Sequence, residues 1–225
     1  MKMRLKDKKR AIDLRVQGKT YSEIIASIPN LSKSTLSGWV KNTNFTPEQK
    51  QNLKKHLEDV THSAREKSAW IKREKRQERI RNIIKEAEKE YFYLSKNSFF
   101  LICLSLYWAE GNKKTEHFQF TNSDPYAIKA IMRWLIEICK IPKNEIKFRL
   151  YMHKIYAHEN CEKFWSGVTG IPILNFQKTI FKPTPHKVKK NINYKGCVQL
   201  RVLKSAFYWR VMGWMQKLIK EYRLN

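Results

Sequence analysis

The stretch CLSLYWAEG, residues 103–111, decides how the second half of this chain is expected to fold. Its apolar residues predict a helix, and Ser105 and Ala109, four residues apart, fall on one face of it. Such small side chains let two helix backbones approach closely. Gly111 is expected to end the helix, because only glycine enters the left-handed cap conformation without strain. Glu110 is then the last helical residue, where the same residue of a second copy can stand beside it.

Two carboxylates a few ångströms apart repel each other unless they share a cation. The stretch therefore predicts a metal site made by two copies of one helix. A buried amphipathic helix with a capping glycine and an exposed glutamate explains the same residues without a metal. The interpretation consequently depends on the rest of the chain.

The stretch resembles the signature helix of the LAGLIDADG homing endonucleases. Aligned on the terminal acid and glycine, it places Leu106 on the second leucine of the signature, Ser105 on its first glycine, Ala109 on its second alanine and Glu110 on its metal-binding acid. The match has departures. Tyr107 and Trp108 stand where the family has isoleucine and its first aspartate, and the acid itself is glutamate.

The net charge of the chain favours a polyanionic partner. Lys and Arg total 46 against 20 Asp and Glu, a formal charge of +26. Nucleic acid is the first candidate for such a partner, and a ribosome-associated protein or a merely soluble basic surface is the alternative. The aromatic content of 12% argues against a disordered basic tail. Residues 96–225 carry 23 basic and 8 acidic side chains, so the excess is greatest in the part that contains the motif.

The sequence also bears on the compartment. No apolar run reaches the roughly 18 residues of a membrane span, and the charged start lacks the apolar core of a secretory signal. The cysteines are scattered without a CxxC pair, which is typical of reduced, mostly buried thiols; they are Cys103, Cys139, Cys161 and Cys197. We expect a cytoplasmic, nucleoid-associated protein with no membrane partner and no small-molecule substrate.

The first domain, residues 1–43, is expected to contain three short helices, at 8–17, 21–28 and 32–41, with Leu31 as a buried plug. This arrangement resembles the helix-turn-helix of resolvase-type and transposase-type DNA-binding domains. The resemblance implies that the third helix lies in the major groove of DNA. Its outward positions are Lys33, Ser34, Thr35, Ser37 and Lys41. A three-helix bundle that binds protein is the alternative.

Residues 44–95 are expected to form a charged helical connector, either one long helix over 47–94 or two joined helices. A cap, a proline in the first turn and Gln49 predict its start after Thr46. The apolar stripe within 80–94 is expected to pack on the C-terminal domain or on a partner copy. Residues 50–79 are interpreted as a solvated spacer.

The C-terminal domain, residues 96–225, is expected to be α+β, with strands at 118–121, 145–153, 176–182 and 197–203 and helices covering one face. The clearest strand alternates an apolar face with a basic and aromatic face. The second face carries Lys147, Arg149, Tyr151 and His153. Further DNA contacts are expected from Lys178, Lys182, Lys187, Gln199 and Arg201.

The LAGLIDADG resemblance extends over about 97–222, since that family has a curved four-stranded saddle that holds DNA, with helices behind it. One departure is visible: the family normally places two strands after the signature helix, and here only one precedes the next helix. The sheet order is therefore left open.

The resemblance implies a homodimer through the helix at 97–111, with Ser105, Tyr107, Trp108 and Ala109 in the dimer contact. It also implies Mg²⁺ held by Glu110 and Gly111 of both copies. A basic side chain normally assists such catalysis. Lys178, Lys147 and His153 are the candidates by location, with no choice made among them, and a plain phosphate contact is the favoured explanation of any single one.

These inferences lead to a sequence-specific double-stranded DNA-binding protein that hydrolyses phosphodiester bonds as a divalent-metal-dependent homing endonuclease. The first alternative is a transcription regulator with a degenerate LAGLIDADG domain that binds DNA without cutting. A transposase-like recombinase is the second. Such a recombinase needs a cluster of three acidic residues on separate helices or strands, and the basic C-terminal domain has few acidic residues.

Overall fold

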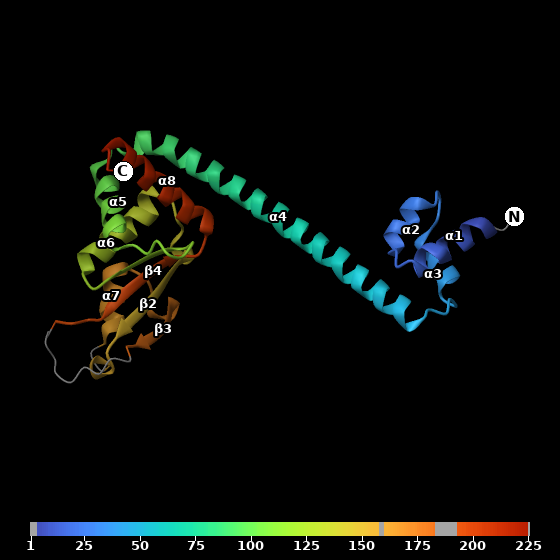
Figure 1. Cartoon of the computed structure of the whole chain (residues 1–225). Coiled ribbons are helices and arrows are strands. Elements are labelled where there is room, and N and C mark those ends of the chain that lie inside the picture. The colour runs from blue at the N-terminus through green and yellow to red at the C-terminus, as the bar shows by residue number, and fades with distance from the viewer. Residues whose placement is uncertain (1–3, 158–159, 183–192, 225) are drawn as a thin grey trace. The chain divides into compact units, whose positions relative to one another are not determined.

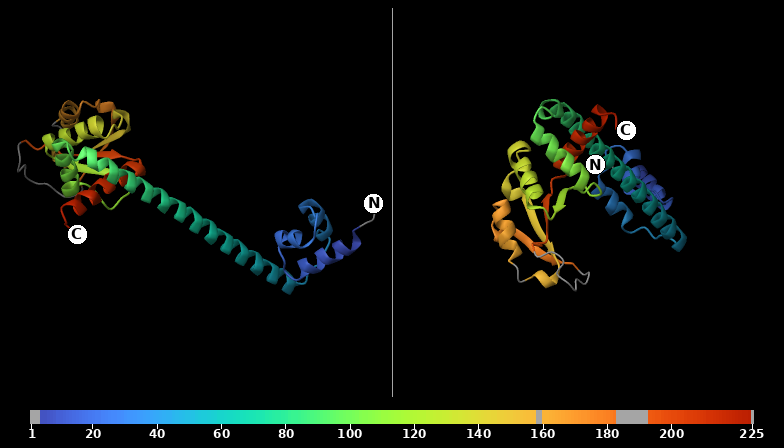
Figure 2. Two further views of the ribbon diagram at one scale, coloured as in Figure 1. Left: turned by 90° about the horizontal axis from the view of Figure 1, so that it is seen from above. Right: turned by 90° about the vertical axis from the view of Figure 1, so that its left-hand side faces the viewer.

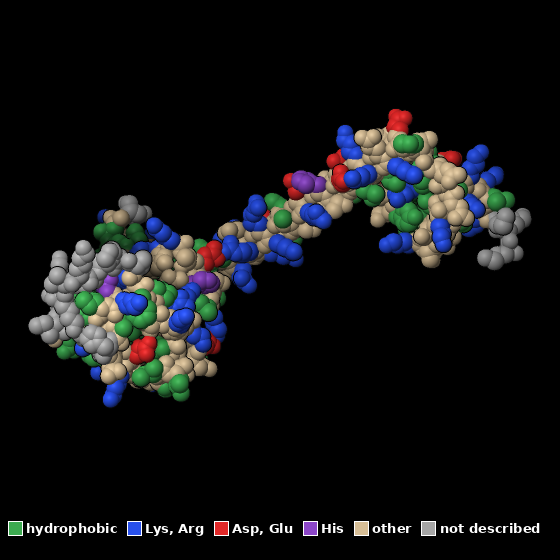
Figure 3. Space-filling model, turned by 90° about the horizontal axis from the view of Figure 1, so that it is seen from below, with side chains coloured by type: hydrophobic (Ala, Val, Ile, Leu, Met, Phe, Trp, Pro, Cys, Tyr) green, Lys and Arg blue, Asp and Glu red, His purple; other side chains and the backbone are tan. Residues whose placement is uncertain are grey.

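The computed structural model describes residues 4–157, 160–182 and 193–224, and within them the chain is α+β, as expected (Figure 1). The chain divides into two compact units, residues 1–76 and 77–225. Helix α4 is one continuous helix, Pro47–Leu94, of 48 residues. The residues expected as a connector are therefore shared between the two units. Lys and Arg side chains recur along α4, as Figure 3 shows.

The first unit contains three short helices before α4. They are α1 (Leu5–Val16), α2 (Tyr21–Ser27) and α3 (Lys33–Val40). Side chains at the starts of α2 and α3 satisfy backbone N–H groups that have no partner within a helix, and this fixes where the two helices begin. Thr20 and Ser32 supply those caps. A small core joins the three helices, and Leu31 is buried in it at 5% exposure, as predicted.

The second unit continues from the C-terminal part of α4. Its helices are α5 (Ser98–Glu110), α6 (Pro125–Arg133) with a π-helical extension (Trp134–Ile138), α7 (Cys161–Thr169) and α8 (Ser205–Glu221). Three single 3₁₀ turns occur at Lys143–Glu145, Lys154–Tyr156 and Ile173–Asn175. The helix expected from residue 158 begins at Cys161, and residues 158–159 lie outside the described residues.

The four expected strands are all present. They are β1 (Phe118–Asn122), β2 (Ile146–Met152), β3 (Phe176–Phe181) and β4 (Cys197–Val202). They form one sheet in the order β1-β4-β2-β3. β4 is antiparallel to both β1 and β2, whereas β3 runs parallel to β2, to which α7 connects it. As the sequence indicated, β1 is the only strand between α5 and α6.

Helices from this unit cover one face of the sheet (Figures 1 and 2). The core is aromatic: Phe118 of β1 lies 6.0 Å from Trp134 and 5.4 Å from Phe207 of α8, measured between ring centroids. Phe100 of α5 stands edge-on to Trp214 at 5.3 Å. Because successive side chains of a strand point to opposite faces, the polar residues that alternate with these core residues lie on the other face of the sheet.

The last turns of α4 pack closely on α8, which confirms the apolar stripe predicted at 80–94. Ala87 and Tyr91 are each 1% exposed. Gly213 makes the close approach possible, because a Cβ on it would lie 2.8 Å from the Ala87 Cβ and 3.0 Å from the Ile84 carbonyl oxygen. Arg210 of α8 donates to Glu90 at 2.7 Å beside this contact.

Candidate nucleic-acid interface

Helix α3 presents polar side chains to solvent along one side. Leu36 and Val40 face the core, whereas the five side chains predicted to point outward are exposed: Lys33, Ser34, Thr35, Ser37 and Lys41. The Ser32 hydroxyl accepts from the Thr35 amide at 3.1 Å and lies 2.9 Å from the Ser34 hydroxyl. The start of α3 is therefore rigidly capped, with two hydroxyls and a lysine around it.

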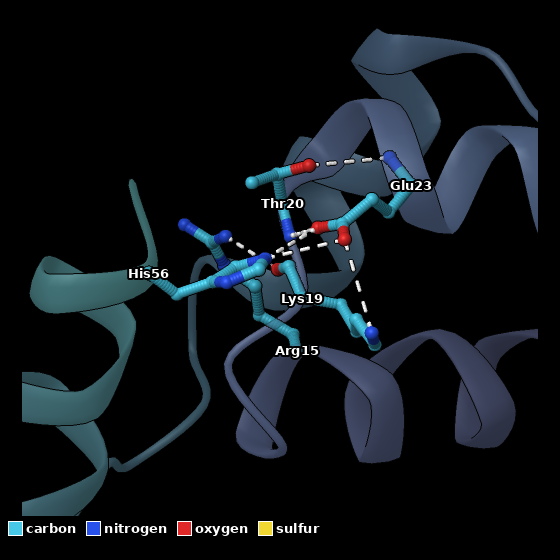
Figure 4. A network of polar contacts seen from close by, with 5 residues as sticks. All are labelled: Arg15, Lys19, Thr20, Glu23 and His56. Atoms are coloured by element: carbon cyan, nitrogen blue, oxygen red, sulfur yellow. Dashed lines mark hydrogen bonds and ion pairs between the residues drawn. The ribbon is translucent and has the colours of Figure 1, made fainter. Parts of the chain in front are cut away.

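Within the first unit, a polar network holds the start of α2 against α4 (Figure 4). Glu23 accepts from the Thr20 amide at 2.7 Å, and the Glu23 amide donates to the Thr20 hydroxyl at 3.2 Å, which closes a capping box. His56 of α4 lies 3.0 Å from the same carboxylate. The Thr20 amide, then His56, lower the pKa of Glu23 to about 2. The network fixes α2, and with it the turn that leads into α3.

The face of the sheet that points away from the helices is cationic and amide-rich. The strand register aligns Gln119, Arg201 and Lys147 across β1, β4 and β2. The next row, two residues along, contains Thr121, Gln199, Arg149 and Gln177 of β3. None of the four strands contains an Asp or Glu. Every formal charge that the four strands bring to this face is therefore positive.

Hydrogen bonds fix part of this face and leave part of it unpaired. Tyr151 donates to Gln199 at 3.3 Å, and Gln199 donates to Thr121 at 3.3 Å. By contrast, the Nε atoms of Arg149 and Arg201 are buried without a hydrogen-bond partner among the described residues.

The remaining predicted contacts lie around the β3 end of the sheet. Lys178 is exposed on β3, next to the irregularity where the register between β2 and β3 shifts. Lys182 follows β3, and its amide donates to the Met152 carbonyl at 2.8 Å. His153 follows β2 and lies 6.3 Å from the Tyr194 ring. Lys187 lies outside the described residues.

The end of α5 differs from the sequence-based expectation in one respect. Gly111 is not in the left-handed conformation; its φ of −73° and ψ of 148° are extended. Glycine is needed there for a steric reason, because a Cβ would lie 2.4 Å from the Tyr107 ring and from the Tyr107 carbonyl oxygen. Gly111 pairs with Phe120 as an isolated β-bridge. Glu110, which is exposed, therefore lies at the β1 edge of the sheet.

The outer side of α5 carries the small residues of the motif. Ser105 and Ala109 are exposed, together with Ile102 at 56% and Trp108 at 37%. Tyr107, also expected in a dimer contact, is fully buried and stacks on Phe118 at 4.5 Å. The correction follows from helix geometry: residue 107 lies on the side that carries Cys103 and Leu104, which face the core.

The donor set at the end of α5 fits Mg²⁺ only in part. The Glu110 carboxylate is an oxygen ligand of the kind the ion prefers. The Gly111 carbonyl oxygen, the other expected ligand, accepts from the Lys113 ammonium at 2.8 Å. Among the described residues of one chain, no three His, Cys, Asp or Glu side chains are grouped as metal ligands. A cation here needs ligands from a second copy, phosphate or water.

Sequence reasoning missed several residues of this surface. Gln119 and Thr121 join the polar face through the pairing of β1 with β4. Their alternation with Phe118 and Phe120 could have predicted that they point away from the core. Lys113, three residues after Glu110, donates to the carbonyls of Trp108 and Gly111. Its partners lie only five and two residues earlier, so a lysine just after the end of a helix was a local signal that sequence reasoning did not use.

Comparison of the chain with protein-family models, with curated proteins and with solved structures found no match. Among the described residues, none of the helices has both the length and the apolar character needed to span a membrane.

Proposed function

We propose that the protein binds double-stranded DNA through two surfaces, the exposed side of α3 and the polar face of the sheet. The observation that carries the proposal is the sheet face, where Lys147, Arg149 and Arg201 stand without any acid on the strands. Guanidinium and ammonium groups in such a row suit successive phosphates, and amide side chains beside them suit base edges.

The first unit supports sequence-specific binding. Its α2, turn and α3 are similar to a helix-turn-helix of resolvase or transposase type, in which the second of these helices enters the major groove. Lys33 and Lys41 flank the exposed hydroxyls of Ser34 and Ser37, so this side offers both phosphate and base contacts. On this proposal the protein acts in the cytoplasm, at the nucleoid.

The second unit supports hydrolysis of the bound DNA in the manner of a LAGLIDADG homing endonuclease. The exposed side of α5 with Ser105 and Ala109 would meet the same side of a second copy and bring two Glu110 carboxylates together. Mg²⁺ bound there would supply an activated water and stabilise the leaving oxygen. Lys113 offsets the negative end of the α5 dipole beside Glu110. Lys178 is the candidate basic side chain, and arginines of the sheet would hold the phosphates.

The second candidate function is a transcription regulator that binds the same DNA and does not cut it. The ammonium of Lys113 on the Gly111 carbonyl favours this alternative, because it places a positive charge where a metal ligand was expected. DNA binding is common to both candidates, so only the chemistry at Glu110 separates them.

Selection from a random duplex library, in Mg²⁺ and in Ca²⁺, tests both proposals. Bound and cleaved sequences are expected with Mg²⁺. Glu110→Gln, which keeps the side-chain shape, is expected to abolish cleavage and retain binding, whereas Glu137→Gln on the helical side is expected to cut normally. Enrichment of bound but never cut sequences would assign the regulator. Failure to enrich any sequence contradicts the proposed function altogether.

A further inference from the structure

An apolar stripe runs along α4 within the first unit. Leu57, Val60, Ala64 and Ile71 are separated by steps of three, four and seven residues, the spacing of a coiled-coil seam. Leu57, Val60 and Ile71 are 38%, 40% and 38% exposed. The stripe is separate from α5 and from the sheet face. Residues 57–79 are all exposed in one chain, as expected of a solvated spacer, so the described residues do not cover the stripe.

Charge is sorted around this part of the helix. Glu58, Asp59, Arg65 and Glu66 lie on the side opposite the stripe, as a rotation of about 100° per residue requires. The positions that flank the stripe are uncharged: Thr61, Ser63, Ser68 and the exposed Trp70. From 57 to 71, Lys67 is the single charge within the stripe itself. Apolar and charged residues thus fall on different sides of this segment, as they do in a helix that buries one side.

The spacing specifies what covers the stripe. A repeat averaging 3.5 residues is the pattern of a helix that pairs with another helix of the same repeat. The same segment of a second copy meets that condition at every position. A single charged residue in an apolar seam is also a device that fixes register and oligomeric state in coiled coils. We propose that residues 57–71 of α4 pair with residues 57–71 of a second copy.

The area buried between two copies of residues 57–71 determines how strongly they are expected to pair. Fifteen helical residues extend about 22 Å, and such a contact buries less than the roughly 800 Å² per partner of a standard interface. The pairing is therefore expected to be weak, and its loss is measured as a rise in the dissociation constant of the dimer. The inference does not rest on DNA binding or hydrolysis, and the seam is separate from the α5 contact in the proposed nuclease.

A matched pair of substitutions tests the pairing in the full chain. Ala64 lies in the seam and Ala69 lies on the opposite side, and both are exposed on the same helix. Ala64→Glu and Ala69→Glu therefore change charge, size and helix propensity equally. Circular dichroism verifies that both variants keep their helix. Sedimentation equilibrium from about 1 to about 100 µM then measures the dimer dissociation constant.

We expect Ala64→Glu to raise the dissociation constant at least tenfold and Ala69→Glu to leave it unchanged. Lys67→Leu, which completes the apolar seam, is expected to lower the constant. A wild-type chain that stays monomeric throughout would overturn the inference. So would equal constants for the two glutamate variants, which is the result if copies associate through α5 alone.

Discussion

The ammonium of Lys113 donates a hydrogen bond to the carbonyl oxygen of Gly111, with 2.8 Å between Nζ and O. The same ammonium lies 2.6 Å from the Trp108 carbonyl oxygen. One side chain thus satisfies two carbonyls at the C-terminus of α5 and places a positive charge where the helix dipole is negative. The Lys113 ammonium thus offsets the negative end of α5, where the exposed Glu110 stands.

Replacing Lys113 with methionine should lower the free energy of unfolding by about 0.3 to 1 kcal/mol, the usual contribution of a cation at a helix C-terminus. Urea denaturation measures the change. Lys114→Met is the control, because the Lys114 ammonium makes neither of these two bonds. Equal losses in the two variants would show that Lys113 contributes only as a general surface charge.

A glycine-to-alanine substitution is expected to have opposite effects at two sites. Gly213 lies in the close contact between α4 and α8, and Gly167 lies in α7 with open space around it. Gly213→Ala should destabilise by about 1 to 3 kcal/mol, because its Cβ would lie 2.8 Å from that of Ala87. Gly167→Ala in α7 meets nothing within 4 Å and should stabilise by up to about 1 kcal/mol through helix propensity. Thermal unfolding of both variants measures the difference. A stable Gly213→Ala protein would mean that α4 and α8 separate at little cost.

The capping box in the first unit predicts a specific pH dependence. The folded-state pKa of Glu23, about 2, lies below its ordinary value of 4.5. A carboxyl whose pKa is lowered by folding stabilises the folded state at pH values above its ordinary pKa of 4.5. This stabilisation is lost as the pH falls from about 4.5 toward 2. NMR titration of the Thr20 amide, which donates to this carboxylate, should show a midpoint near pH 2.

His56→Ala should raise that midpoint only part of the way, because the Thr20 amide is the larger cause of the lowered pKa and remains in place. Glu23→Gln should abolish the transition. A midpoint near 4.5 in the wild-type chain would show that the carboxylate is not held by the box.

Much of the fold follows from local sequence, as β2 illustrates. Its strict alternation predicted which side chains face the core, and Ile146, Phe148, Leu150 and Met152 are all buried. The start of α3 was equally predictable, because a serine cap acts over three residues. Burial also governs the thiols as expected: the pKa of Cys103 is raised to about 12 by desolvation.

What local sequence did not predict depends on distant partners. Gly111 is extended where it pairs with Phe120 of β1, a partner that the chain reaches only after it has turned back. The alignment of Arg201 with Lys147 follows from a register between strands that are far apart in the sequence. A single helix motif therefore located Glu110 but not the residues that surround it.

The sheet face makes the most direct prediction about DNA. If Arg149 and Arg201 each neutralise one phosphate, their replacement by glutamine should reduce the slope of log K against log salt by about 0.9 each. Arg133→Gln on the helical side, where Arg133 pairs with Glu137 at 3.1 Å, is the control and should leave the slope unchanged. Fluorescence anisotropy with one duplex at several salt concentrations gives the slopes.

Because a phosphate contact is independent of base sequence, the two replacements should weaken selected and unrelated duplexes alike. An unchanged slope in the double variant would exclude the sheet face from the DNA contact and leave α3 as the surface to examine.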